Sequence, residues 1–196
     1  AGGDIDDALA RRIVAAGIGR VSISLDGSTP ATHDAFRGRA GSFATALAGF
    51  DALRRAGAAV QINTTVTRRN EAELGAVLEL ALARGAAAVH VFLLVPVGCG
   101  AEIDPADRLG PAETERTLAW LFARSAELAD RLPIRLTCAP HYQRVARQVG
   151  RRSGPAAASP AGPAPGSGGH PGGAPSSRGC LAGQTVCFVS RTGEVQ

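Results

Sequence analysis

Aromatic residues are scarce in this chain, which has one Trp, one Tyr and six Phe among 196 residues. The formal net charge of +4 comes mainly from scattered arginines, with only short clusters such as Arg151 and Arg152. Proteins that bind nucleic acids usually show a concentrated basic face with aromatic side chains for stacking. We therefore expect an arginine-rich, solvated surface and no nucleic-acid partner, while a basic interior patch that receives an acidic substrate stays open.

Long apolar runs are also missing. No stretch approaches the roughly eighteen uninterrupted apolar residues that a membrane span needs, and residues 1–12 lack the basic-then-apolar order of a signal peptide. We expect no membrane partner and a cytoplasmic location. The apolar content of 45% is sufficient for a buried core.

Cysteines are few and widely spaced, at positions 99, 138, 180 and 187. This number is too small for a disulfide scaffold, and the absence of a CxxC pair argues against a zinc module. Reduced thiols or metal ligands fit better. The sequence also lacks the GxxxxGK[ST] and GxGxxG patterns, so we expect no phosphate binding by a glycine-rich turn.

Strand-like and helix-like segments alternate along the first three quarters of the chain. Strands are predicted at residues 21–25, 58–66, 89–97 and 134–138, and helices at 4–17, 42–56, 70–85 and from 111 to about 128. Asn70 and Glu73 have the spacing of a capping box at the start of the third helix. Apolar strands that alternate with helices indicate parallel βα units. We therefore predict an α/β fold that forms part of a barrel.

The composition changes near residue 150. Residues 150–179 are mostly Gly, Pro, Ala and Ser, without apolar side chains larger than alanine or proline, so they cannot pack a core. Residues 180–196 regain strand character and contain a turn at Thr192 and Gly193. The expected organisation is a barrel portion at 1–149, a disordered linker at 150–179, and the start of a small β-hairpin domain from 180.

Ligands of parallel α/β folds bind beyond the carboxyl ends of the strands. This rule selects Ser24, Asp26, Asn63, Thr65, residues 96–99, Cys138 and His141. Polar side chains within an apolar strand need hydrogen-bond partners, which a polar cofactor or an ordinary core network can supply. Asp26 can equally belong to an Asp-Gly turn. We expect Cys99 to act as a small buried apolar residue and His33, His90 and His170 to be structural or surface residues.

Two segments resemble a known family. The sequences VSISLDGSTPATHDAFRG (21–38) and QINTTVTRRN (61–70) resemble the fourth and fifth strands of radical S-adenosylmethionine (radical SAM) enzymes. The resemblance implies that this chain forms the later part of that family's partial (β/α)6 barrel. It also implies that Ser24 and Asp26 lie near the ribose or methionine moiety of S-adenosylmethionine (AdoMet), with Asn63 and Thr65 beside it.

The tail is similar to the opening of a SPASM or twitch domain, which holds an auxiliary iron–sulfur cluster. The first ligands of that domain follow the pattern Cys, spacer, Gly, four residues, Cys. Cys180 and Gly193 fit the first half, and the second cysteine would fall beyond Gln196. The resemblance makes Cys180 the first candidate metal ligand, followed by Cys187 and Cys138.

The strings FLLVPVGCG (92–100) and TCAPHYQRV (137–145), together with the tail, most resemble the subgroup that modifies tetrapyrroles in heme d1 and alternative heme synthesis. The CxxxCxxC motif that holds the catalytic 4Fe-4S cluster of the family does not occur in the 196 residues. We expect it before Ala1 in a longer protein, so these residues alone are not expected to cleave AdoMet.

The resemblance implies that AdoMet is reduced through the cluster to give a 5'-deoxyadenosyl radical, which abstracts a hydrogen atom from the substrate. In the tetrapyrrole branch, this step would remove or oxidatively decarboxylate an acetate or propionate side chain. Arg37, Arg39 and Arg144 are candidates for pairing with substrate carboxylates, and His141 is a further substrate candidate. A ferredoxin or flavodoxin would donate electrons. No catalytic residue is assigned.

Three alternatives stay open. A radical SAM maturase of ribosomal peptides shares the SLDG segment and the auxiliary-cluster opening. The second alternative is that the chain is a non-catalytic α/β binding module that has lost the iron–sulfur cluster. A metal-independent barrel enzyme would need an acid–base pair at the strand ends, where only Asp26 is suitable.

Overall fold

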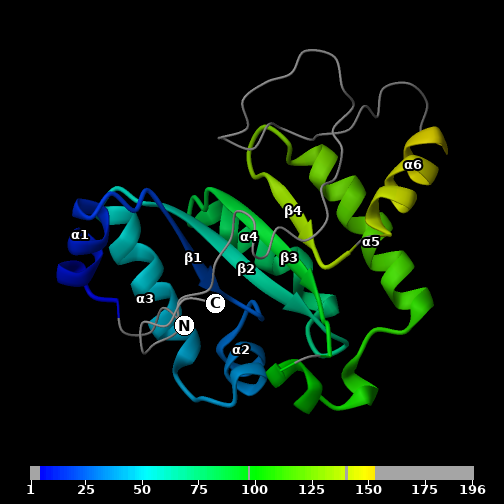
Figure 1. The fold of residues 1–196 in the computed structure, drawn as a ribbon, viewed down its shortest axis with the longest axis horizontal. Coiled ribbons are helices and arrows are strands. Elements are labelled where there is room, and N and C mark those ends of the chain that lie inside the picture. Colours follow the sequence, from blue (N-terminus) through cyan, green and yellow to red (C-terminus); the bar gives the residue numbers. More distant parts are fainter. Residues whose placement is uncertain (1–4, 97, 140, 153–196) are drawn as a thin grey trace. The chain divides into compact units, whose positions relative to one another are not determined.

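The structure is a computed structural model that describes residues 5–96, 98–139 and 141–152. Four strands form one parallel sheet in chain order: β1 (Arg20–Ser24), β2 (Ala59–Val66), β3 (Ala88–Leu93) and β4 (Ile134–Thr137). The helices are α1 (Asp7–Ala15), α2 (Pro30–Arg37), α3 (Ser42–Arg55), α4 (Leu74–Ala83), α5 (Pro111–Glu127) and α6 (Tyr142–Arg152), with 3₁₀ helices η1 (Glu71–Glu73), η2 (Gly98–Glu102) and η3 (Pro105–Asp107). The predicted α/β fold with a parallel sheet is confirmed (Figure 1).

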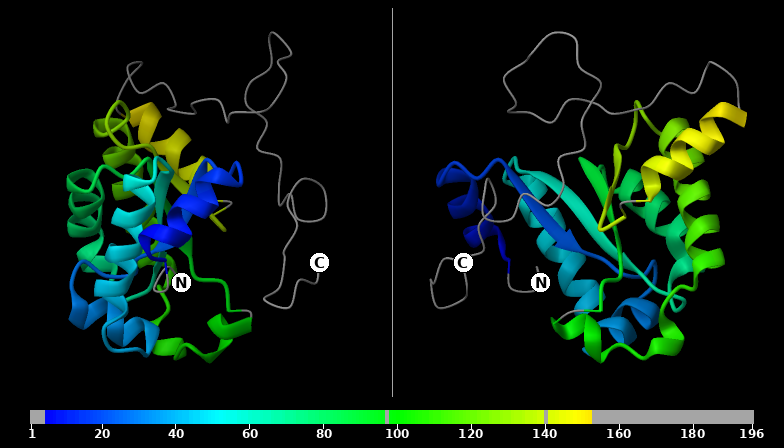
Figure 2. Two further views of the ribbon diagram at one scale, coloured as in Figure 1. Left: turned by 90° about the vertical axis from the view of Figure 1, so that its left-hand side faces the viewer. Right: turned by 45° about the vertical axis from the view of Figure 1, so that its right-hand side comes forward.

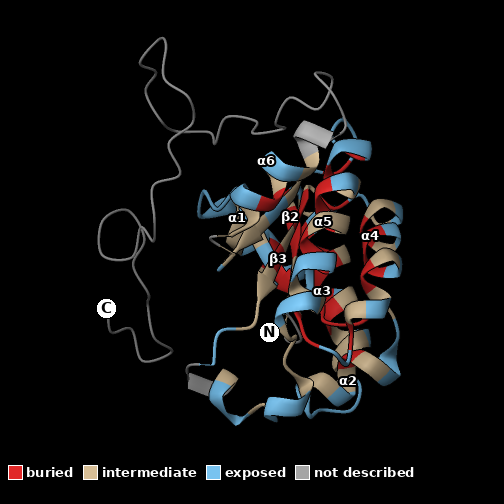
Figure 3. Cartoon of the chain, turned by 90° about the vertical axis from the view of Figure 1, so that its right-hand side faces the viewer, coloured by how far each residue is buried: buried red, intermediate tan, exposed pale blue. Residues whose placement is uncertain are grey.

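The helices that connect neighbouring strands lie on the same side of the sheet. α3 connects β1 to β2, α4 connects β2 to β3, and α5 connects β3 to β4, and all three are on one side in Figure 3. A doubly wound sheet would instead carry helices on both faces. Sequential parallel strands with helices on one side form the wall of a barrel, in agreement with the predicted partial barrel.

Alternation along each strand explains why helices cover one face. Side chains two residues apart point to the same side of a sheet, and one such set is apolar and at most 2% exposed: Ile23, Val60, Ile62, Val66, Val89 and Val91. These residues share one buried cluster with Phe50 and Leu53 of α3, Leu78 of α4 and Leu121 of α5. The core therefore lies between the sheet and the three connecting helices.

Two helices were not predicted from the sequence. The first, α2, begins with Pro30 and ends at Gly38, whose φ of 62° is the left-handed conformation that glycine adopts readily. The second, α6, packs on α5 (Figure 2), where the Tyr142 and Phe122 rings are 6.4 Å apart. No helix in the described ranges is long and apolar enough to cross a membrane.

The predicted capping box at Asn70 is wrong. The chain forms η1 after Asn70, and α4 begins only at Leu74, without a side-chain cap from Asn70. The Asn70 amide oxygen instead accepts a hydrogen bond from the Thr67 N–H (2.8 Å), and the Glu73 carboxylate accepts one from the Ser28 N–H (2.7 Å). Both polar side chains are thus used to fix loops rather than the helix start.

Two strands are shorter than predicted. β3 ends at Leu93 rather than at residue 97, and η2 follows it. β4 ends at Thr137 because Cys138 has a φ of 57°, which is incompatible with a strand. At the other boundary, α6 continues to Arg152. The first three residues of the linker predicted at 150–179 are therefore helical, which corrects its start. The rest of that linker and the predicted cluster segment at 180–196 lie outside the described residues and stay predictions.

We expect Leu53→Ala to lower the free energy of unfolding by about 2–5 kcal/mol, because it removes a fully buried side chain and leaves a cavity. Chemical denaturation followed by circular dichroism measures this change. Ile18→Ala is the control, since Ile18 is 47% exposed and its truncation should change stability by no more than about 0.5 kcal/mol. Equal effects of the two substitutions would contradict the described core.

Candidate functional site

The face of the sheet opposite α3, α4 and α5 is mostly polar, although Phe92 of β3 lies on it in register between Thr65 and Thr137. Its side chains come from alternate strand positions: Ser22 and Ser24 on β1, Gln61, Asn63 and Thr65 on β2, His90 on β3, and Arg135 and Thr137 on β4. We call this set the polar face. A hydrogen bond of 2.7 Å from Gln61 Nε2 to Ser22 Oγ confirms that adjacent strands contribute to the same side.

Four of these side chains form one row across the sheet. Ser24 pairs in register with Asn63, Asn63 with His90, and His90 with Arg135. The structure thus places the predicted residues Ser24 and Asn63 next to each other. Thr65, which was also predicted, lies two residues beyond Asn63 on β2, closer to the carboxyl edge of the sheet.

Several polar groups of this face are available to a ligand. The hydroxyls of Ser24 and Thr65 form no hydrogen bond within the part of the chain that the structure describes, and neither does the amide nitrogen of Asn63. The Asn63 amide oxygen accepts only a long hydrogen bond of 3.4 Å from Gln61. Hydroxyl and amide groups can recognise a ribose, a carboxylate or an ammonium group.

Asp26 differs from these residues because its polar atoms are already used. The residue is completely buried. Its N–H donates to His33 Nδ1 (3.0 Å), its Oδ1 accepts from the Thr65 N–H (2.7 Å), and its backbone carbonyl accepts from Asn70 Nδ2 (2.9 Å). The remaining oxygen, Oδ2, forms an ion pair with Arg37. The structure thus gives Asp26 a role in positioning the end of β2, and its expected place near the cofactor stays a prediction.

Two of the arginines predicted to bind the substrate form ion pairs in this structure, and their substrate role stays a prediction. The Arg37 guanidinium pairs with the buried Asp26 carboxylate, and that of Arg144 pairs with Glu115 and donates to Gln148 (2.8 Å). Both cations thus have partners within the protein. The third candidate, Arg39, is exposed.

His33 is held as a neutral imidazole. It is 2% exposed, and its Nδ1 must be unprotonated to accept the Asp26 N–H. Burial lowers the pKa of His33, while the neighbouring Asp26 carboxylate opposes this effect in part. His33 is thus structural, as expected from the sequence.

The loop after β1 is attached to η1 through a carboxylate. Glu73 accepts hydrogen bonds from the Ser28 N–H and hydroxyl, both 2.7 Å long, and from the Thr32 hydroxyl. Burial raises the pKa of Glu73, but these hydrogen bonds outweigh it and the net pKa is lowered. The ends of β1 and β2 are therefore fixed relative to each other.

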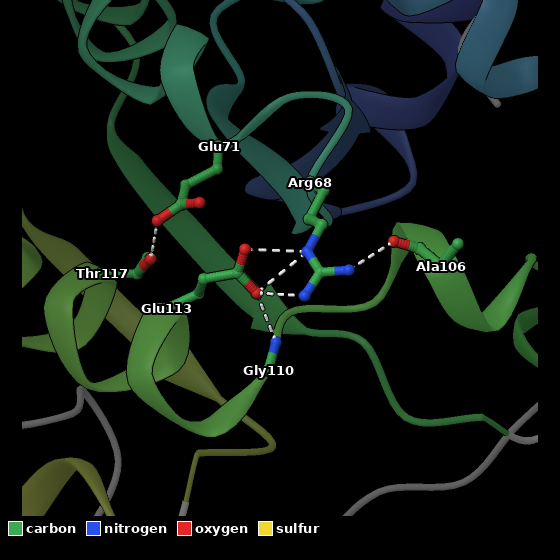
Figure 4. Close-up of polar contacts among 6 residues, drawn as sticks. All are labelled: Arg68, Glu71, Ala106, Gly110, Glu113 and Thr117. Atoms are coloured by element: carbon green, nitrogen blue, oxygen red, sulfur yellow. Dashed lines mark hydrogen bonds and ion pairs between the residues drawn. The ribbon is translucent and has the colours of Figure 1, made fainter.

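The loop after β2 is similarly attached to the segment that precedes α5 (Figure 4). The Arg68 guanidinium donates to both carboxylate oxygens of Glu113, at 2.7–2.9 Å, and to the Ala106 carbonyl at 2.7 Å. The Gly110 N–H donates to Glu113 at 2.6 Å. The hydrogen bonds from Arg68, followed by that from Gly110, lower the pKa of Glu113 to about 2. These contacts order the loops around the carboxyl edge of the sheet.

No metal centre is assembled in the described ranges, where no three His, Cys, Asp or Glu side chains are grouped for coordination. Cys138 is exposed at the end of β4, and His141 is half-buried just before α6. Cys180 and Cys187 lie outside the described residues. The predicted set of iron–sulfur ligands therefore stays a prediction.

His90 and Arg135 are the functional candidates that sequence reasoning missed. His90 was expected to be structural, and Arg135 was not considered. The alternation of side chains along a strand could have identified them. His90 and Arg135 each alternate with apolar residues of a short strand, so each faces away from the core. Only the register shows that they continue the row from Ser24 and Asn63.

A protein-family model described as the Radical SAM superfamily matches residues 1–81. An AdoMet-dependent heme synthase of Methanosarcina barkeri is 41% identical over 187 residues, which cover 95% of this chain and 50% of that protein. This chain belongs to the radical SAM superfamily. A pre-heme d1 synthase of Dinoroseobacter shibae is 36% identical over 121 residues, covering 62% of this chain and 30% of that protein.

The solved structure of native anSMEcpe with bound AdoMet has the same fold, with a TM-score of 0.55 at 18% identity, covering 68% of this chain and 37% of that chain. The resemblance to radical SAM enzymes, and within them to those named for heme and heme d1 synthesis, is confirmed. This radical SAM chain spans about half the length of the heme synthases that it matches.

The buried imidazole leads to a pH prediction. An unfolded histidine gains a proton near pH 6.5, whereas folded His33 has a lowered pKa and gains one only at lower pH. The unfolded state thus binds more protons as the pH falls from about 7 to 5.5, so the free energy of unfolding should decrease, by at most about 1.4 kcal/mol per pH unit from this group. Denaturant titrations across this range measure the slope.

His33→Asn is the matched variant, because its amide oxygen can replace Nδ1 as acceptor for the Asp26 N–H but does not titrate. Its slope should be smaller than that of the wild type. Some slope should remain, since the pKa of His90 is also lowered by burial. An unchanged slope in His33→Asn would show that His33 is not responsible.

Proposed function

We propose that this chain is the AdoMet- and substrate-binding part of a radical SAM enzyme that acts on a tetrapyrrole in heme or heme d1 synthesis. The observation that carries the proposal is 41% identity to an AdoMet-dependent heme synthase over 95% of the chain. These relatives support an enzyme over a non-catalytic module. The activity is proposed for the whole protein. Its proposed partner is an electron donor such as a ferredoxin or flavodoxin, and its proposed location is the cytoplasm.

The polar face supports AdoMet binding. AdoMet carries a ribose diol, a carboxylate and an ammonium group, and the unpaired hydroxyls of Ser24 and Thr65 and the amide of Asn63 can satisfy such groups. When bound with its 4Fe-4S cluster, AdoMet supplies the 5'-deoxyadenosyl radical that abstracts a substrate hydrogen atom. The chain's own residues bind and orient the cofactor.

Asp26 supports this site indirectly. Its Oδ1 holds the Thr65 N–H, and its backbone carbonyl and that of Thr65 both accept from Asn70 Nδ2, at 2.9 and 2.8 Å. Because Asp26 and Asn70 are buried, these bonds are protected from competing water. We assign to Asp26 the positioning of Thr65 relative to Ser24.

The cluster itself is proposed to lie outside the described residues, because these offer no group of three ligands. We therefore derive no step through it from this structure. Cys180, with Cys187 and Cys138 as further candidates, is proposed to help bind an auxiliary cluster in a SPASM-like domain that begins at residue 180, after a linker at 153–179.

We expect Asn63→Ala and Thr65→Ala each to weaken AdoMet binding by roughly 2- to 10-fold, the effect of losing one neutral hydrogen bond. Anaerobic calorimetry on the reconstituted protein measures the dissociation constant. Thr45→Ala is the matched control, because Thr45 lies on α3 and its hydroxyl contacts only backbone carbonyls of its own helix start. Wild-type affinity in both polar-face variants would remove this face as the cofactor site.

The substrate class is tested by product formation. With a reductant, the reconstituted protein should form more 5'-deoxyadenosine when a carboxylate-bearing tetrapyrrole is added, because substrate hydrogen abstraction draws the reaction forward. Chromatography with mass detection measures 5'-deoxyadenosine and the mass lost by the tetrapyrrole. Stimulation by a peptide but by no tetrapyrrole would reject the proposal and favour the peptide-maturase alternative.

A further inference from the structure

Two arginines of the polar face have no partner. Arg20 and Arg135 lie at positions that alternate in phase with Ser22 on β1 and Thr137 on β4, so both belong to the polar side of the sheet. Neither guanidinium forms a hydrogen bond or an ion pair within the described residues. Both residues are exposed.

The charges of both arginines act on the same imidazole. Burial lowers the pKa of His90, and the positive charges of Arg135 and then Arg20 lower it further. Arg135 is the register partner of His90, whereas Arg20 lies at the start of the opposite edge strand, four residues before Ser24. His90 Nε2 is buried without a hydrogen-bond partner among the described residues. The positive charge of Arg135 thus lies on the strand next to an imidazole with unused hydrogen-bonding capacity.

No negative charge balances this region. The strand positions of the polar face carry no Asp or Glu, and the nearest acidic residue along β1, Asp26, is paired with Arg37. Other arginines of the described residues, such as Arg116 and Arg131, also lack a carboxylate partner, but neither lies in a strand of the sheet. What distinguishes Arg135 is its place in the row with His90 and Asn63, where it is available to an anionic ligand.

We propose that Arg135 binds a carboxylate of the substrate on the polar face. The guanidinium group suits this task because its paired N–H groups match both oxygens of a carboxylate. The inference rests on the proposed function and refines it, since it adds Arg135 to the candidate substrate-binding arginines. It also defines the substrate as an anion.

Strand spacing separates this subsite from the proposed AdoMet groups. Arg135 is two strands away from Asn63 in the same row, which corresponds to about 10 Å at a strand separation of about 4.8 Å. A ligand at Asn63 and Ser24 and a carboxylate at Arg135 can thus be bound together. His90 lies between them.

The test is equilibrium binding of coproporphyrin III, which carries four propionates, and of its tetramethyl ester to the complete reconstituted protein. Arg135→Gln should weaken binding of the acid by roughly tenfold or more, the usual effect of removing a charged hydrogen-bond partner, and Arg135→Lys should weaken it less. The ester should bind the wild type and Arg135→Gln equally. Arg116→Gln, which removes an exposed arginine on α5, is the matched control and should have no effect.

AdoMet affinity, measured in the same variants, should be unchanged. If Arg135→Gln binds coproporphyrin III as tightly as the wild type, the inference is overturned while the proposed function stands. If the variant instead loses AdoMet affinity, the arginine serves the cofactor and the inference is again overturned. If the wild-type protein does not bind coproporphyrin III, the tetrapyrrole assignment fails and the inference fails with it.

Discussion

The covering of one sheet face by helices is the constraint on which this structure depends. Because α3, α4 and α5 all lie on the same side, each strand must present apolar side chains there, and its alternate positions are released from that requirement. Those positions carry Ser24, Asn63, His90 and Arg135, which share one row. A sheet covered on both faces would not tolerate this row without a partner for each group. The same constraint thus produces the core and the site.

Buried polar contacts hold the strand ends in the arrangement that the site needs. Asp26 and Asn70 are each at most 2% exposed, and together they connect the end of β1, the end of β2 and the loop before η1. Losing either side chain would leave buried N–H and carbonyl groups unpaired, which costs more than the bond itself contributes. These residues fix backbone positions at the ends of β1 and β2.

Much of the fold could be predicted from the sequence, because apolar periodicity and strand-terminating turns are local signals. The same reasoning selected Ser24, Asn63 and Thr65, since hydroxyl and amide groups inside apolar strands stand out. It could not reveal that Arg37 pairs with Asp26, or that Arg144 pairs with Glu115, because such pairs form only when the helices pack. The capping box failed for a similar reason: Glu73 has the right type and spacing, but Ser28 and Thr32 compete for its carboxylate. Arg135 was missed because β4 has only four residues, too few for its alternation to be recognised.

The unpaired Arg135 of the polar face is informative because of its place beside His90. Burial and the positive charge of Arg135 lower the pKa of His90. A protonated imidazole there would add a second positive charge next to the arginine. Binding sites often contain residues that contribute little to stability. Arg135 is such a candidate because it lies in register with a row of hydrogen-bonding groups. The electrostatics of the sheet therefore point to an acidic ligand independently of the heme synthases that the chain resembles.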